Sequence, residues 1–248
     1  MAAGAVLVAY TSLSASQADN PIESSAKKSY VFKTYLKDDA IKAESKNGAV
    51  ILTGTVADAT HKALAQDTVE CLPGVTSVDN RLKVTSESPP EHSDLWINMK
   101  VKSALLFHRN ANASGTDVYV TDGVVTLRGE ASSLTQKEMT TEYARDIDNV
   151  KEVRNEMSIV RTTLSANETI VEKIDDASVT AQVKSALMSL RSTSALKTKI
   201  QTRAGVVTLS GVAKNEAEKS LVTRMVIDIN GVNGLINNMT ITAPVAAN

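Results

Sequence analysis

Apolar and polar residues alternate along three stretches of the chain. Each stretch is centred on a dipeptide that ends in glycine: Asn47-Gly48, Asp122-Gly123 and Ala204-Gly205. Period-two alternation predicts strands, and Asn-Gly or Asp-Gly between two such runs indicates a two-residue hairpin turn with positive φ. The third dipeptide is a weaker form of the same signal. The pattern therefore predicts three β-hairpins.

A second glycine and a later asparagine follow each hairpin at a constant distance. The glycines are Gly54, Gly129 and Gly211; the asparagines are Asn80, Asn155 and Asn237. In every copy the asparagine lies 26 positions after the glycine. Equal spacing without a gap indicates one supersecondary unit present three times. We expect the glycines to occupy a bulge or a close backbone approach, and the asparagine side chains to bond backbone groups near the last strand.

A helix is predicted between the glycine and the asparagine of each copy. It begins at a good N-cap residue and ends at a residue that tolerates positive φ. The N-caps are Asp58, Ser133 and Asn215, and the helix stops are Gly74, Asn149 and Gly231. The asparagine then lies in a strand of alternating apolar residues, which completes a β-β-α-β unit.

A further amphipathic helix precedes each hairpin. It is predicted over residues 93–107 and 178–190 in the second and third copies, which share the sequence Val-Lys-Ser-Ala-Leu, and over 22–37 in the looser first copy. The predicted class is α+β, with three tandem α-β-β-α-β modules at residues 22–85, 93–161 and 176–243. We expect each module to be a small mixed three-stranded sheet covered by two helices.

The N-terminal 18 residues carry no charge. An apolar run over residues 2–10 is followed by Ser16 and Ala18, small residues at the −3 and −1 positions of a cleavage site. This pattern predicts a signal peptide over residues 1–18 and export, although a basic n-region is missing. The alternative is an apolar tail without that role.

Composition narrows the chemistry that is available. Lys and Arg total 27 against 28 Asp and Glu, so no global positive field attracts nucleic acid. With one cysteine and three histidines at no ligand spacing, we expect no metal, no cofactor and no catalytic residues. Cys71 falls at a helix end, where it is either inert or forms an intermolecular disulfide.

These motifs together resemble the BON domain family. The resemblance rests on Val-Lys-Ser-Ala-Leu, then Asp-Gly-Val-Val-Thr-Leu-x-Gly, a capped helix and a strand with asparagine, and it covers about residues 22–243. It implies a non-enzymatic periplasmic module associated with phospholipid contact, envelope integrity, osmotic stress and chaperone-like binding. Three copies depart from the two that are usual in the family.

The opening helix of the second module suggests a membrane contact. Trp96 lies near its start beside Lys100 and Lys102, and Phe107 lies at its end. An aromatic side chain with flanking cations suits an anionic phospholipid surface. Alternatively, Trp96 covers the module core against the preceding Pro-rich linker. A second function class is a periplasmic chaperone or adaptor that binds client proteins; the oligomeric state is left open.

Overall fold

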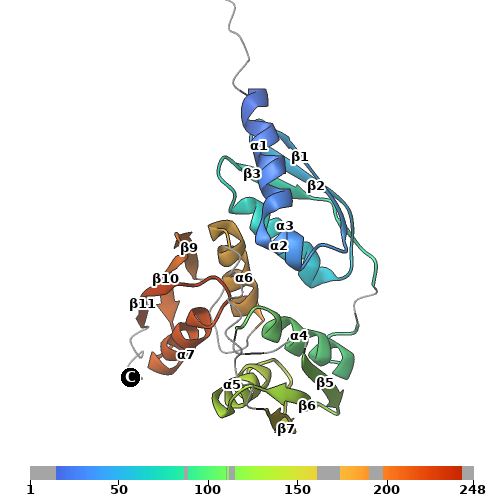
Figure 1. The fold of residues 1–248 in the computed structure, drawn as a ribbon, viewed down its shortest axis with the longest axis vertical. Helices are drawn as coiled ribbons and strands as arrows, with labels where there is room; N and C mark the ends of the chain where they lie inside the picture. Colours follow the sequence, from blue (N-terminus) through green and yellow to red (C-terminus); the bar gives the residue numbers. More distant parts are fainter. Residues whose placement is uncertain are drawn as a thin grey trace, which may run out of the picture.

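The computed structural model describes residues 15–86, 89–109, 111, 115–160, 174–189 and 198–241. Over these residues the chain forms the three predicted α-β-β-α-β modules, and the α+β prediction is confirmed (Figure 1). The predicted signal peptide lies outside the described residues except for 15–18, which begin the first helix. Most of the second linker, residues 161–173, also lies outside them.

Module 1 differs from the expected pattern in its opening segment. Two helices replace the single helix expected over 22–37, and the break falls at Ser29, whose side-chain oxygen accepts a bond from the Phe32 amide. The elements are α1 (Ala15–Lys28), α2 (Tyr30–Thr34), β1 (Ala40–Lys46), β2 (Ala49–Val56), α3 (Ala59–Glu70), β3 (Ser77–Asn80) and β4 (Lys83–Val84).

Modules 2 and 3 follow the prediction more closely. Module 2 contains α4 (Asp94–Leu106), β5 (Thr116–Thr121), β6 (Val124–Ala131), α5 (Leu134–Arg145), β7 (Glu152–Asn155) and β8 (Ser158–Ile159). Module 3 contains α6 (Asp176–Met188), β9 (Lys199–Arg203), β10 (Val206–Ala213), α7 (Glu216–Ile227) and β11 (Gly234–Ile241).

Each sheet is mixed, because its central strand pairs antiparallel with one neighbour and parallel with the other. The central strands are β2, β6 and β10. The parallel edge strand is interrupted in modules 1 and 2, where it appears as β3 with β4 and as β7 with β8. In module 3 the corresponding strand, β11, pairs with β10 without interruption over eight residues.

The glycine and turn predictions are confirmed. Asp122 and Gly123 adopt φ of 51° and 78°, the positive values that a two-residue hairpin turn needs. Gly129 has a φ of 120°, and a Cβ on it would lie 2.0 Å from the Gly115 carbonyl oxygen. Gly54 is equivalent, with a φ of 115° and a distance of 1.9 Å to the Ala40 oxygen. Only glycine fits this close approach.

The three repeated asparagines tie the last strand to the preceding helix. Asn155 donates from Nδ2 to the Lys137 carbonyl oxygen and to Thr141 Oγ1, both at 2.8 Å, and accepts from the Met157 amide at 3.0 Å. Asn80 and Asn237 make the same set of bonds at equivalent positions. The asparagine therefore satisfies backbone groups, as predicted, and also fixes the strand against the helix.

A carboxylate at the start of the opening helix accepts hydrogen bonds from the hairpin turn. The sequence predicted the turn but not these bonds. In module 2, Asp94 accepts bonds from the Asp122 and Gly123 amides at 2.7 and 2.9 Å. In module 3, Asp176 accepts two equivalent bonds at 2.8 Å. Charge-assisted bonds of this kind are stronger than neutral ones and orient the helix relative to the sheet.

The modules do not pack in chain order. Buried residues of modules 1 and 3 form one apolar core, in which α3 packs against α6 (Figure 1). Module 2 has its own core, to which Met225 of α7 contributes. Lys184 of α6 also pairs with Asp67 of α3 at 2.5 Å. Burial raises the pKa of the Asp67 carboxyl even though Lys184 lies beside it.

We expect Gly129→Ala to lower the free energy of unfolding by roughly 2 to 4 kcal/mol, since it adds a clash to an unfavourable φ. Gly234→Ala is the matched control, because its Cβ would make only ordinary contacts with Val206, the nearest at 3.6 Å. Denaturant unfolding of both variants measures the difference. Equal stabilities would disprove the role assigned to Gly129.

Candidate functional site

Helix α4 presents apolar and basic side chains on its surface together. Trp96 is half-buried against the core of module 2, and Lys100 Nζ lies 5.5 Å from its ring centroid. The His92 ring meets Trp96 edge-on at 5.4 Å, so the indole also covers part of the linker. Leu95 is 63% exposed and Lys102 is exposed. The structure thus brings three of the four predicted contact residues, Trp96, Lys100 and Lys102, to one helix that is buried on its inner face only.

Phe107 corrects the prediction. Its side chain is 0% exposed and packs in the core shared by modules 1 and 3, where its ring meets the Tyr35 ring edge-on at 5.2 Å. The prediction of Phe107 as a membrane contact is therefore wrong. An apolar ring at the C-cap of α4 instead anchors module 2 to its neighbours.

The opening helices of the three modules differ in accessibility. In module 3, α6 is largely buried because it packs against α3, and its Lys184 is paired with Asp67. In module 1, the exposed lysines of the opening segment are Lys27, Lys28, Lys33 and Lys37. The basic faces available to a partner therefore belong to modules 1 and 2.

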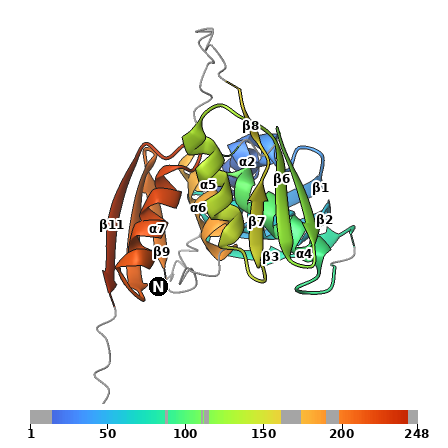
Figure 2. The ribbon, with the colours of Figure 1, turned by 90° about the horizontal axis from the view of Figure 1, so that it is seen from below.

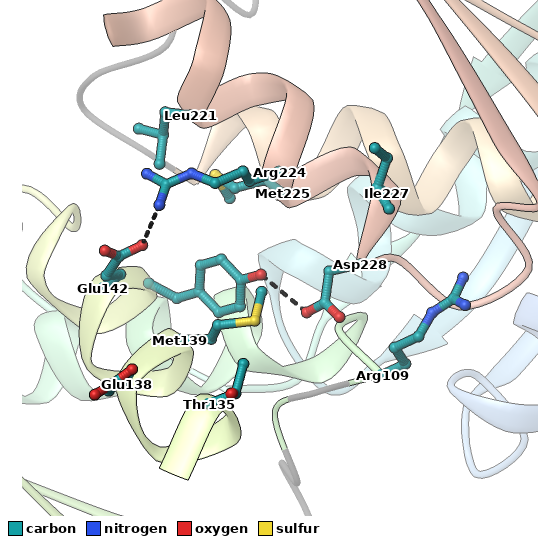
Figure 3. Close-up of a pocket in the computed structure, with 11 residues that line it drawn as sticks. Arg109, Thr135, Glu138, Met139, Glu142, Leu221, Arg224, Met225, Ile227 and Asp228 are labelled. Carbon is teal, nitrogen blue, oxygen red and sulfur yellow. Dashed lines mark hydrogen bonds and ion pairs between the residues drawn. The ribbon is translucent and has the colours of Figure 1, made fainter. Parts of the chain in front are cut away.

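A cavity of about 530 Å³ lies between α5 of module 2 and α7 of module 3 (Figure 3). Its apolar lining comes from both helices and consists of Met139, Tyr143, Leu221, Met225 and Ile227. Methionine side chains adapt to irregular apolar groups. The cavity is therefore an amphiphilic pocket that exists only because two modules are docked.

Charged groups surround this pocket. Arg224 Nη1 lies 3.3 Å from Glu142 Oε2 across the opening, and the Tyr143 hydroxyl donates to Asp228 at 2.9 Å (Figure 3). Arg109 donates through Nη2 to the carbonyl oxygens of Ile229 and Val232 at 2.9 and 2.7 Å. Both arginines are thus engaged with protein groups.

A buried histidine lies directly behind the pocket. The His108 ring stacks on Tyr143 with 3.9 Å between centroids, and its Nδ1 lies 3.4 Å from the Asp228 carboxylate without a hydrogen bond. Beside it, the Arg109 amide donates to the Asp228 carbonyl oxygen at 2.8 Å. Sequence reasoning placed His108 at a helix end but missed this cluster, because its members meet only when modules 2 and 3 dock.

The described residues offer no metal centre and no membrane-crossing helix. No group of three or more His, Cys, Asp or Glu among them is arranged to hold a metal ion. None of their helices is long and apolar enough to cross a bilayer. The arrangement offers two places for a partner to bind, the surface of α4 and the pocket.

Cys71 is the C-cap of α3, at the position that Asp228 occupies in α7. It is a free, exposed thiol. Partial desolvation by the surrounding protein, together with the nearby Asp67 carboxyl, raises the pKa of the Cys71 thiol to about 11. A thiol with this pKa is mostly protonated at neutral pH and reacts slowly.

The fold defines a class: a protein of three tandem α+β modules. The model of the BON domain family matches residues 18–86, 93–161 and 175–243, and the chain belongs to the BON domain family. Osmotically-inducible protein Y of Escherichia coli (strain K12) is 27% identical over 179 residues, which cover 67% of this chain and 87% of the relative.

Two solved structures show a weaker likeness. The first is of CdsD, a structural protein of the type III secretion system of Chlamydia trachomatis, with 15% identity and a TM-score of 0.25 over 90% of this chain and 91% of that chain. The second is the C-terminal domain of the same protein, with 16% identity and a TM-score of 0.22 over 90% and 96%. These TM-scores carry no argument about fold or function.

We expect the stability of the protein to fall as the pH rises above about 10. Burial, together with Asp228, raises the pKa of Tyr143; burial, together with Tyr30, raises that of Tyr35. Above about pH 10 these tyrosines lose their protons in the unfolded chain but keep them in the folded chain. The free energy of unfolding therefore falls by up to about 1.4 kcal/mol per pH unit for each tyrosine. Denaturant unfolding between about pH 9 and 11 measures this slope. It should flatten in Tyr143→Phe, with Tyr119→Phe as the exposed control; an unchanged slope in Tyr143→Phe would contradict the assignment.

Alkylation of Cys71 should be slow at neutral pH and should accelerate up to about pH 11. Relative to an ordinary thiol, the thiolate population is lower by on the order of 100-fold. Iodoacetamide labelling of the native protein against pH measures the titration, with the urea-unfolded chain as reference. Equal rates for the native and unfolded protein would show that the fold does not suppress the thiolate.

Proposed function

We propose that this protein is a non-enzymatic, osmotic-stress-related protein of the periplasm that binds anionic phospholipid surfaces through α4. The observation that carries the proposal is the combination on one helix of exposed Leu95 and Lys102 with half-buried Trp96 and Lys100. Membership of the BON domain family and the similarity to osmotically-inducible protein Y support the cellular setting.

The chemistry of α4 suits the interface between headgroups and acyl chains. Leu95 and Trp96 supply apolar area, and a half-buried indole is already oriented by the core beneath it. Lys100 and Lys102 supply positive charge, each worth about 1 kcal/mol near an anionic surface. Asp94, the acidic residue in the first turn of α4, is occupied by the hairpin amides, so it does not compete for these lysines.

Module 1 contributes additional attraction in this proposal. Its exposed lysines lie on the opening segment, where Lys27 and Lys28 occupy the last turn of α1. Two weak basic sites on one chain raise the apparent affinity when both reach the same surface. The buried α6 takes no part.

The pocket between α5 and α7 favours a second candidate, a chaperone or adaptor that binds envelope client proteins. Its apolar lining suits a client side chain, and its rim contains both signs of charge. Such binding depends on apolar contact and therefore persists in high salt. The two candidates are thus separated by their salt dependence and by the variants that weaken them.

Co-sedimentation of the full chain with vesicles tests the proposal. We expect binding to phosphatidylglycerol-containing vesicles, weak binding to neutral ones, and loss in high salt. Lys100→Glu combined with Lys102→Glu should weaken binding by about 30-fold or more, since it removes at least about 2 kcal/mol. Trp96→Ala should weaken it further.

The matched control is Lys199→Glu combined with Arg203→Glu, which makes the same charge change on exposed positions of module 3. This control should bind nearly as the parent does. Equal losses of vesicle affinity in both double variants would show that only net charge matters and would contradict a specific role for α4. The absence of binding to any vesicle would also overturn the proposal. Suppression of the aggregation of an unfolded client, lost in Met139→Glu, would then favour the chaperone.

A further inference from the structure

The last strand of every module forms one edge of its sheet, but the three edges differ in charge. Modules 1 and 2 place ion pairs there: Arg81 with Asp79 at 2.7 Å, and Arg154 with Glu152 at 2.9 Å. The equivalent strand of module 3, β11, contains no charged residue from Gly234 to Ile241. Charged residues on an edge strand normally prevent pairing with another chain.

Aligning the copies on their shared asparagine identifies the substitutions. Ile236 stands where modules 1 and 2 have Asp79 and Arg154, and Asn238 stands where they have Arg81 and Glu156. Both residues are exposed, Ile236 by 50%. Module 3 therefore lacks, at the same positions, the charges that protect the last strands of modules 1 and 2 from pairing.

The backbone of β11 also differs from its counterparts. It runs as one strand of eight residues, whereas β3 with β4 and β7 with β8 are interrupted. β11 is the terminal strand of its sheet, with β10 on its inner side and no partner strand among the described residues on its outer side. Figures 1 and 2 both place it at the periphery of the molecule, away from modules 1 and 2.

We propose that β11 pairs with β11 of a second copy of this chain, antiparallel about a two-fold axis, to form one continuous sheet. An uncharged strand meets its own copy without repulsion, whereas the exposed edge β9 carries Lys199 and Arg203 and the edge β1 carries Lys42 and Lys46. An isologous pair of this kind closes and leaves no open end.

The side chains of β11 suit such self-pairing. With the axis at Asn238, the two Asn238 amides face each other, and Ile236 faces the partner's Thr240. Amide pairs and contacts between apolar and β-branched residues stabilise cross-strand neighbours. Ile236, which is 50% exposed, is the apolar side chain of β11 that this pairing would cover.

Sedimentation velocity of the full chain over a wide concentration range tests the pairing. We expect a concentration-dependent dimer for the parent. Ile236→Lys combined with Thr240→Lys should weaken it by about 100-fold or more, because the axis brings like charges together. The same loss is expected for Ile236→Glu combined with Thr240→Glu. Tyr119→Lys, on an exposed sheet position of module 2, is the control and should dimerise as the parent does.

Mixing the two double variants provides the decisive measurement. The lysine and glutamate strands attract each other, so the mixture should dimerise although neither variant does so alone. Circular dichroism and thermal unfolding verify that both variants are folded. A parent that stays monomeric, a dimer that survives both double variants, or folded variants whose mixture stays monomeric would each overturn the proposal. Vesicle binding through α4 is measured separately, so the outcomes for the two surfaces remain distinguishable.

Discussion

The arrangement of the modules depends on the packing of the Phe107 ring between them. The ring belongs to module 2 but packs in the core of modules 1 and 3 against Tyr35, while the Phe107 carbonyl oxygen accepts from the Asn230 amide at 3.0 Å. With the end of α4 fixed in this way, His108 and Arg109 must lie against the end of α7. The pocket between α5 and α7 and the outward direction of the start of α4 are consequences of that anchor.

The repeated unit could be predicted because its determinants are local. Turn dipeptides, N-caps and the glycine at the close approach each act within a few residues, and the structure confirms them at Gly129 and Asn155. The bonds from Asp94 to the hairpin amides join residues almost 30 positions apart, and no local pattern indicates them. The burial of Phe107 depends on which module surfaces meet. The one available signal was the scarcity of aromatic residues, since a rare ring at a helix end more often fills a core than faces solvent.

The three modules share one fold but bury different parts of its surface. The opening helix is largely buried in module 3 but buried on one face only in module 2, although both helices contain Val-Lys-Ser-Ala-Leu. Identical local sequence therefore gives the same helix but not the same role, because Lys184 meets Asp67 whereas Lys102 meets solvent. The last strands of the modules differ as well: those of modules 1 and 2 carry charged residues, whereas β11 of module 3 carries none.

Module 3 contacts both of the other modules, so much of its helical surface is already used within the molecule. Its α6 contacts module 1, and the end of its α7 contacts module 2, so both helices are committed within one molecule. The two edge strands of its sheet, β9 and β11, have no further partner strand among the described residues. No described strand lies against the outer side of β11, so the absence of charge on this strand does not follow from strand pairing within the described part of the chain. A contact outside the chain gives the substitutions at Ile236 and Asn238 a physical reason. A dimer formed there would also double the number of α4 helices per particle, and avidity would rise where both helices reach one surface.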